Sequence, residues 1–71
     1  MGIIELGETI KNRRKNLGIN QTDLAEMAGI SKNTLYQLER GQSNPSWAVV
    51  YKILDILGLE LNINIKKVVT T

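Results

Sequence analysis

Cysteine and histidine are both absent from this 71-residue chain. Without cysteine the chain forms no disulfide, and without either residue a zinc site would need an unusual shell made of carboxylates alone. A chain of this size buries only about 60% of the surface that its unfolded form exposes, so its stability is marginal. Association with another chain is the remaining route to extra burial.

The residue types of a catalytic site are also scarce. Serine and threonine are present, but no histidine can act as their base. No glycine-rich phosphate loop occurs, and the acidic residues are scattered over the surfaces of the expected helices. We therefore expect a protein that is not an enzyme and that binds no cofactor and no metal.

Long hydrophobic runs are missing as well. No apolar run approaches the roughly 20 residues that a membrane span needs. The first residues, Met1 to Leu6, lack the basic region and apolar run of a signal peptide. We expect a cytoplasmic protein with no membrane contact. Its formal net charge of +2 is by itself only a weak indication of a nucleic-acid partner.

The spacing of apolar residues predicts four helices, and a glycine follows each of them. The expected ranges are about 6–17, 21–28, 32–40 and 47–57, with the glycines at 18, 29, 41 and 58. Asn20, Ser31 and Ser46 are suitable N-caps for the last three helices. Trp47, at the start of the fourth helix, is expected to lie in the core.

The segment that follows, residues 59–67, alternates apolar and polar residues, which is the period of a half-buried strand. A lone strand exposes an unpaired edge, so we expect it to pair with the same segment of a second copy. The fourth helix has more apolar surface than one small core requires, which also favours a homodimer. The expected dimer-interface residues are Val49, Ile53, Ile56, Leu59, Leu61, Ile63 and Ile65.

One side of the third expected helix carries amide and cationic groups. The side chains that share this arc at 3.6 residues per turn are Lys32, Asn33, Tyr36, Gln37 and Arg40. Leu35 and Leu38 point roughly the other way. A helix whose apolar side is packed and whose amide and cationic side is free can lie in the major groove of DNA.

The order of residues from Gln21 to Ser46 resembles the Cro/C1 repressor-type (XRE) helix-turn-helix family. The resemblance rests on Gln21, Leu24, Ala25, Ala28, Gly29, Ile30, Ser31, Leu35, Glu39, Gly41 and the run Ser43-Asn44-Pro45-Ser46. It implies an all-α, four-helix lambda-repressor-like DNA-binding domain over residues 1–58. The short C-terminal strand at 59–67 and a frayed tail at 68–71 complete the expected organisation.

The family reads bases with early residues of the second helix of the motif. The matching positions and their neighbours are Lys32, Asn33, Thr34, Tyr36 and Gln37. A lysine suits guanine O6 or N7, and the amides of Asn33 and Gln37 suit adenine N6 and N7. Tyr36 is expected to touch a thymine methyl or a phosphate. The alternative for each position is a solvated polar side chain.

Phosphate contacts are expected at two places. The N-terminus of helix 21–28 presents free N–H groups, and the family uses the glutamine that matches Gln21 on a phosphate. The alternative for Gln21 is a simple helix-start residue. The full set of expected phosphate contacts is Gln21, Thr22, Arg40, Gln42 and Ser43.

The resemblance also implies a structural ion pair between Arg14 and Glu39. Such a pair would tie the first helix to the end of the third. Arg13 is a rival for the role, because it borders the apolar stripe of its helix on the other side.

A second resemblance covers Ile53 to Ile65. A helix-turn-helix domain followed by Leu57-Gly58-Leu59-Glu60-Leu61 and an alternating strand is similar to small Hip-type antitoxins. It implies a kinase-like toxin as partner. The chain has no long tail with which to wrap a toxin, and a stand-alone phage, plasmid or mobile-element repressor is the alternative.

Together these features predict a homodimeric, sequence-specific regulator of double-stranded DNA, bound to a palindromic operator and acting as a repressor. Two-fold symmetry places the half-sites about 34 Å apart. The alternative from another class is a protein-interaction module that uses the fourth helix and the strand without binding DNA.

Overall fold

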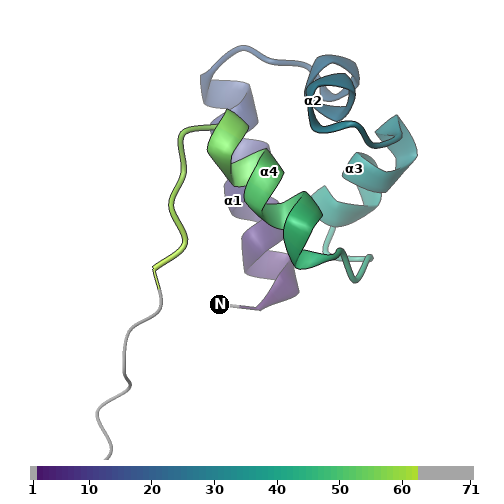
Figure 1. Cartoon of the computed structure of the whole chain (residues 1–71), viewed down its shortest axis with the longest axis vertical. Coiled ribbons are helices and arrows are strands. Elements are labelled where there is room, and N and C mark those ends of the chain that lie inside the picture. The colour runs from purple at the N-terminus through teal and green to yellow at the C-terminus, as the bar shows by residue number, and fades with distance from the viewer. Residues whose placement is uncertain (1, 63–71) are drawn as a thin grey trace, which may run out of the picture.

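The structure, a computed structural model, describes residues 2–62 and contains four helices. They are α1 (Ile3–Asn16), α2 (Gln21–Ala28), α3 (Lys32–Glu39) and α4 (Trp47–Ile56) (Figure 1). The all-α helix-turn-helix fold expected from the sequence is thus confirmed. The first helix begins earlier than expected because the carbonyl of Gly2 already accepts from the N–H of Leu6, at 3.0 Å.

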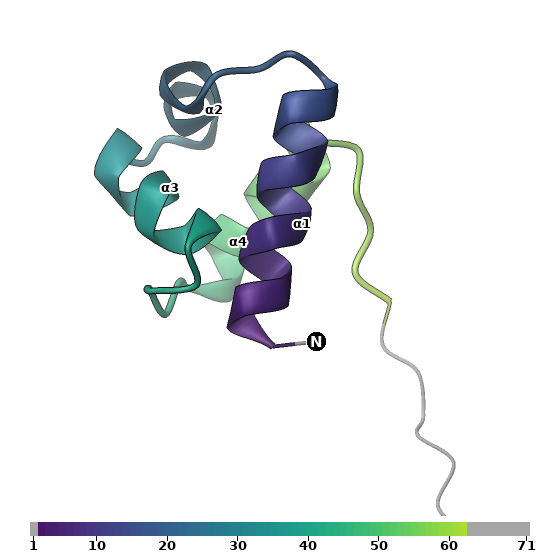
Figure 2. The ribbon, with the colours of Figure 1, turned by 180° about the vertical axis from the view of Figure 1, so that it is seen from behind.

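The four helices surround one small core. Helix α3 contacts both α1 and α2, and α4 packs on α2. In Figure 1, α4 lies in front of α1, and in Figure 2, seen from behind, α1 lies in front of α4. Helices α2 and α3 lie together to one side of this pair in both views. Every helix contributes to the core, whose largest fully buried side chains are Ile10, Leu24, Leu35, Leu38, Ile53 and Leu57.

The starts of three helices are fixed by the caps that the sequence predicts. The side-chain oxygen of Asn20 accepts from the N–H of Asp23 at 2.7 Å. In the same way, the hydroxyl oxygen of Ser31 accepts from the N–H of Thr34 at 3.0 Å, and that of Ser46 from the N–H of Val49 at 3.3 Å. Each such cap stabilises its helix by about 1 kcal/mol. These caps explain why the predicted starts of α2, α3 and α4 agree with the structure.

Gly29 makes the sharp turn between α2 and α3. Its φ of 69° lies in the left-handed region, which a residue with a Cβ adopts only at a cost. The N–H of Ile30 then reaches back to the carbonyl of Ala25 at 3.0 Å, which closes the end of α2. The small side chain of Ala25 is 2% exposed, so the two helices cross closely at this point.

The expectation that Trp47 lies in the core is wrong, because its side chain is 63% exposed. The buried stripe of α4 is formed by Val50, Ile53 and Leu54. At 3.6 residues per turn, Trp47 and Tyr51 lie about 70° and 110° away from the middle of that stripe. They pair with each other instead, with ring centroids 5.7 Å apart.

The expected dimer interface is also partly wrong, because Ile53 is 0% exposed and belongs to the core of its own chain. Val49 and Ile56 are half-buried against that core, as are Leu59 and Leu61. Residues 59–62 form neither helix nor strand. The rest of the expected strand, with Ile63 and Ile65, lies outside the described residues, as does the expected tail at 68–71.

None of the helices within residues 2–62 combines the length and the apolar character that crossing a membrane requires.

Gly7 allows α1 to cross the end of α3 at close range. A Cβ at Gly7 would lie 2.9 Å from the carbonyl oxygen of Glu39 and closer still to that of Leu38. These atoms are backbone, so they cannot swing away as the end of a flexible side chain could. This close contact explains why a glycine occupies the interior of α1. Glycine at such a position otherwise lowers helix stability by about 1 kcal/mol relative to alanine.

We predict that Gly7→Ala lowers the free energy of unfolding by about 1–3 kcal/mol, because the added methyl group forces α1 away from α3. Urea unfolding followed by circular dichroism measures the change. The control is Gly2→Ala at the N-cap of the same helix, where nothing lies within 4 Å of the new Cβ. Equal stability of the two variants would contradict the close contact.

Candidate nucleic-acid interface

Helix α3 separates an inward side from an outward side. Leu35, Leu38 and Glu39 are buried. The exposed side chains on the helix and its C-cap are Lys32, Asn33, Tyr36, Gln37 and Arg40. This is the arc that the sequence predicts for DNA contact. Its members come from successive turns of one short helix, so they form a continuous ridge of amide, hydroxyl and cationic groups.

Thr34 differs from the other expected base-contact residues. It is half-buried, and its hydroxyl lies 2.7 Å from that of Ser31, within the cap at the start of α3. Its side chain therefore belongs to the N-terminal cap of α3. Of the expected base-contact residues, the exposed ones are those on the outward arc of α3.

A buried ion pair ties α3 to α1. The Nε atom of Arg14 donates to Oε2 of Glu39 at 2.7 Å, and Nη2 donates to Oε1 at 3.0 Å. The two side chains are 8% and 2% exposed. Nη1 of Arg14 also donates to the carbonyl of Ile19 at 2.9 Å, so the guanidinium joins α1, the following loop and α3. The expected Arg14–Glu39 pair is thus present, with the bidentate geometry in which two N–H groups of a guanidinium meet the two oxygens of a carboxylate.

Arg13, the rival for that role, acts elsewhere. Its Nε donates to the carbonyl oxygen of Leu57 at 2.9 Å. Leu57 is the C-cap of α4, where carbonyls lack helical partners and the helix dipole favours a cation. The neighbouring arginines therefore tie α1 to two different helices. Periodicity did not predict this contact, because both arginines border the apolar stripe of α1.

Gln21, the first residue of α2, also joins the buried pair. Its Nε2 donates to Oε1 of Glu39 at 3.0 Å, which fixes the side chain beside the N-terminus of α2. One amide hydrogen is therefore engaged within the protein, and the other is free for an external acceptor. Gln21 was expected either to contact a phosphate or to be a simple helix-start residue. These two roles are compatible, because the residue starts α2 and still carries a free N–H donor.

The remaining expected phosphate contacts fall into two groups. Thr22, Arg40 and Gln42 are exposed. The hydroxyl oxygen of Ser43 is buried and has no hydrogen-bond partner among residues 2–62. A phosphate outside the protein cannot reach a hydroxyl that is buried in this way, so the expectation for Ser43 conflicts with this arrangement.

Arg40 and Tyr36 contact each other on the exposed arc. Nη1 of Arg40 donates to the phenol oxygen of Tyr36 at 3.1 Å, and its guanidinium carbon lies 5.3 Å from the ring centroid. The two residues are one helical turn apart, which is a spacing at which side chains meet. That spacing is visible in the sequence and could have predicted the contact.

The part of the chain that the structure describes contains no group of three or more acidic side chains placed to hold a metal ion.

We predict that Glu39→Gln lowers the free energy of unfolding by about 3–5 kcal/mol, because it leaves the buried charge of Arg14 without its partner. Thermal and urea unfolding measure this loss. Glu8→Gln, on the exposed surface of α1, is the matched control and should change stability by less than about 0.5 kcal/mol.

The same pair is tested by a double-mutant cycle with Arg14→Met and Glu39→Leu. The double variant should be less destabilised than the sum of the two single variants, because it removes both charges from the interior. Additive losses would mean that the two side chains do not interact.

Comparison with known proteins agrees with this geometry. The family model HTH_3, helix-turn-helix, matches residues 10–64. An uncharacterized HTH-type transcriptional regulator of Methanothermobacter thermautotrophicus is 39% identical over 51 residues, which are 72% of this chain and 74% of that protein. The ImmF control region 10 kDa protein of Bacillus phage phi105 is 34% identical over 59 residues, which are 83% of this chain and 66% of that protein.

A solved structure shares the same arrangement of helices. The restriction-modification controller protein C.AhdI of Aeromonas hydrophila superposes with a TM-score of 0.77 at 28% identity, over 82% of this chain and 88% of that one. The family match covers more than half of the chain and includes α2, the turn at Gly29 and α3. The chain therefore belongs to the XRE-type helix-turn-helix family, HTH_3.

Proposed function

We propose that this protein is a sequence-specific transcriptional regulator that binds double-stranded DNA with the exposed arc of α3 in the major groove. The observation that carries the proposal is the division of α3 into a buried side, fixed by Glu39, and an outward side of free amide and cationic groups. The relatives named as an HTH-type transcriptional regulator and as a controller protein support the same role.

Within this proposal, Lys32, Asn33 and Gln37 read base edges. All three are exposed, and the hydrogen bonds found among residues 2–62 do not engage their side-chain groups. The bidentate match of an amide to adenine and of a lysine to guanine then gives the preference for particular bases. Gln21, Thr22, Arg40 and Gln42 contact phosphates on either side of the groove, which positions the helix without reading sequence.

The first test is selection from a pool of random DNA duplexes with the full chain. Enrichment of one sequence supports the regulator. Affinity for that sequence should fall with salt: for each unit of log salt concentration, log K should change by about −0.9 per phosphate neutralised. Absence of any enriched sequence would contradict the proposal and favour a protein-interaction module.

We predict that Gln37→Ala weakens binding by about 1–3 kcal/mol at one base pair of the selected site and leaves the other positions unchanged. Gln42→Ala is the contrast, because Gln42 is exposed and loss of its phosphate contact weakens binding to all sequences alike. Titration of both variants against single-base-pair variants of the site measures the difference. A uniform loss for Gln37→Ala would remove it from the base-reading set.

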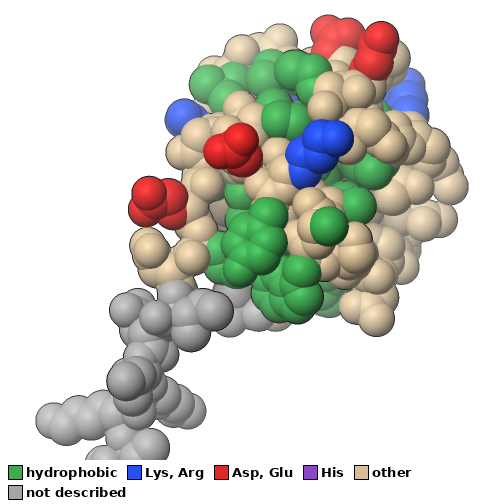
Figure 3. Space-filling view, viewed as in Figure 1, with side chains coloured by type: hydrophobic (Ala, Val, Ile, Leu, Met, Phe, Trp, Pro, Cys, Tyr) green, Lys and Arg blue, Asp and Glu red, His purple; other side chains and the backbone are tan. Residues whose placement is uncertain are grey.

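We further propose that the protein binds a palindromic operator as a homodimer and represses by occluding a promoter. Two subunits related by two-fold symmetry would place their α3 helices about 34 Å apart. Support comes from the surface around α4, where the rings of Trp47 and Tyr51 are 63% and 52% exposed. Figure 3 shows hydrophobic side chains gathered over α4 on this face.

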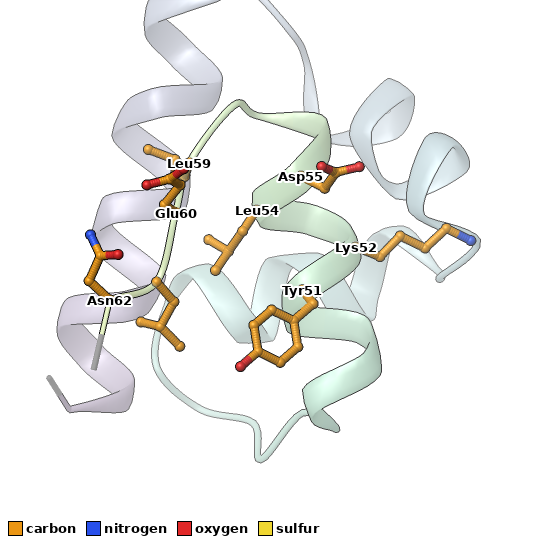
Figure 4. A pocket seen from close by; sticks show the side chains of 8 residues that line it. Tyr51, Lys52, Leu54, Asp55, Leu59, Glu60 and Asn62 are labelled. Carbon is orange, nitrogen blue, oxygen red and sulfur yellow. The ribbon is translucent and has the colours of Figure 1, made fainter. Parts of the chain in front are cut away.

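The same surface contains an open groove between α4 and residues 59–62, with a volume of about 600 Å³. Leu54 projects from α4 towards its floor, and Tyr51, Asp55, Glu60 and Asn62 surround it (Figure 4). Leu54, Leu59 and Leu61 give this groove an apolar part that polar side chains border, and an apolar patch with a polar rim is typical of an interaction site. A second copy that brings the same surface would cover it with matching apolar side chains.

A kinase-like toxin partner finds no support in the relatives reported above, whose names are those of regulators and of a phage control-region protein. The antitoxin role remains a hypothesis from the sequence resemblance. A kinase-like gene beside this one would favour it.

We predict that Tyr51→Glu shifts sedimentation from dimer towards monomer, because it places a charge in the interface of the proposed dimer. Trp47 is the only tryptophan of the chain, so its emission should move to longer wavelength on dilution. Met27→Glu, which adds the same charge to an exposed apolar position of α2, is the control. Solitary molecules at every working concentration would contradict the homodimer.

A further inference from the structure

We infer that Tyr36 is a positioning residue for Arg40, which it holds ready to clamp a DNA phosphate, and that Tyr36 does not read a base. The inference rests on the proposed function and changes the role expected for one residue of the exposed arc.

The contact between the two side chains uses both parts of the tyrosine. The guanidinium carbon of Arg40 lies 5.3 Å from the ring centroid, within the range of a cation–π interaction. Nη1 of Arg40 also donates to the phenol oxygen at 3.1 Å. The backbone N–H of Arg40 donates to the carbonyl of Tyr36 at 3.2 Å, the helical hydrogen bond that holds the two residues one turn apart.

The charge of Arg40 is left available by this arrangement. Within residues 2–62 the one ion pair is that of Arg14 and Glu39, so no described carboxylate neutralises Arg40. The Tyr36 ring attracts the guanidinium without cancelling its charge. A guanidinium carries five N–H donors, and one of them is engaged by the phenol oxygen, so the others can meet phosphate oxygens.

Restraint of Arg40 also lowers the entropy cost of binding. A free arginine side chain has many rotamers, and part of this conformational entropy is lost when it binds a phosphate. Tyr36 restricts the side chain before DNA arrives, so less remains to be lost on binding. The phenol oxygen accepts from Arg40 and the ring lies against the guanidinium, so Arg40 engages the acceptor and one face of Tyr36, while the phenol O–H stays a donor.

The first arm of the test needs no DNA. The Nε–H signal of Arg40 in NMR spectra of the free protein should show restricted motion, and Tyr36→Leu should increase that motion. Tyr36→Phe keeps the ring and removes the hydroxyl, so its effect should be intermediate. Motion of Arg40 that is the same in the native chain and in Tyr36→Leu would overturn the inference.

The second arm measures binding to the selected duplex. Arg40→Gln should reduce the salt dependence of log K by about 0.9 per subunit, the value for one phosphate. Tyr36→Leu should weaken binding about two- to fivefold on every sequence, which is the range for an exposed cation–π contact. In the Arg40→Gln background, Tyr36→Leu should have no further effect.

Lys52→Gln is the charge-matched control. Its side chain starts on α4 at the edge of the groove of Figure 4, and its ammonium reaches towards the turn at Gly29. If Lys52→Gln reduces the salt dependence as much as Arg40→Gln does, the effect reports net charge and the inference is wrong.

The outcomes separate this inference from the proposed function. Additive effects of the two substitutions, or a loss for Tyr36→Leu at one base pair only, would overturn the positioning role while DNA binding stands. Failure of the unchanged protein to bind any duplex would overturn the proposed function, and the DNA-binding role of Arg40 with it.

Discussion

One buried carboxylate determines how three of the four helices meet. Glu39 accepts from Arg14 of α1 and from Gln21 of α2 while it belongs to α3. A charge in this position is strongly destabilising unless its partners stay in place. The orientation of the outward arc of α3 therefore depends on the hydrogen bonds that Glu39 makes on the inward side of the helix. Electrostatic contacts hold the arc in place together with the apolar packing of Leu35 and Leu38.

The structure also divides the polar side chains near α3 by task. Ser31 and Thr34 complete the N-terminal cap, and the hydroxyl of Ser43 is buried. Asn33 and Gln37 remain exposed on the arc. A small domain has few polar groups, and those used to end helices are not available to a ligand. Residue type and spacing predicted Thr34 and Ser43 as DNA contacts, and their hydrogen bonding and burial leave the exposed residues as the groups that can reach DNA.

Local signals predicted most of the fold. Caps at Asn20, Ser31 and Ser46 and the glycine turn at 29 depend on neighbours in sequence, so they placed α2 and α3 correctly. The exposure of Trp47 was not predictable in this way, because α4 is apolar on several sides and periodicity does not say which side is covered. Contacts between distant residues, such as Arg13 with Leu57, depend on tertiary packing. The Arg14–Glu39 pair was accessible only through family resemblance.

Arg13 and Arg14 are consecutive residues with different destinations. One reaches the carbonyl of Leu57, where the chain leaves α4, and the other reaches Glu39 beneath the outward arc. A single turn of α1 is thus hydrogen-bonded both to the C-cap of α4 and to the last residue of α3. Rotation of that turn would change the two contacts together. A shift of the C-terminal end of α4 relative to α1 would stretch the hydrogen bond of Arg13, and a shift of the end of α3 would stretch those of Arg14.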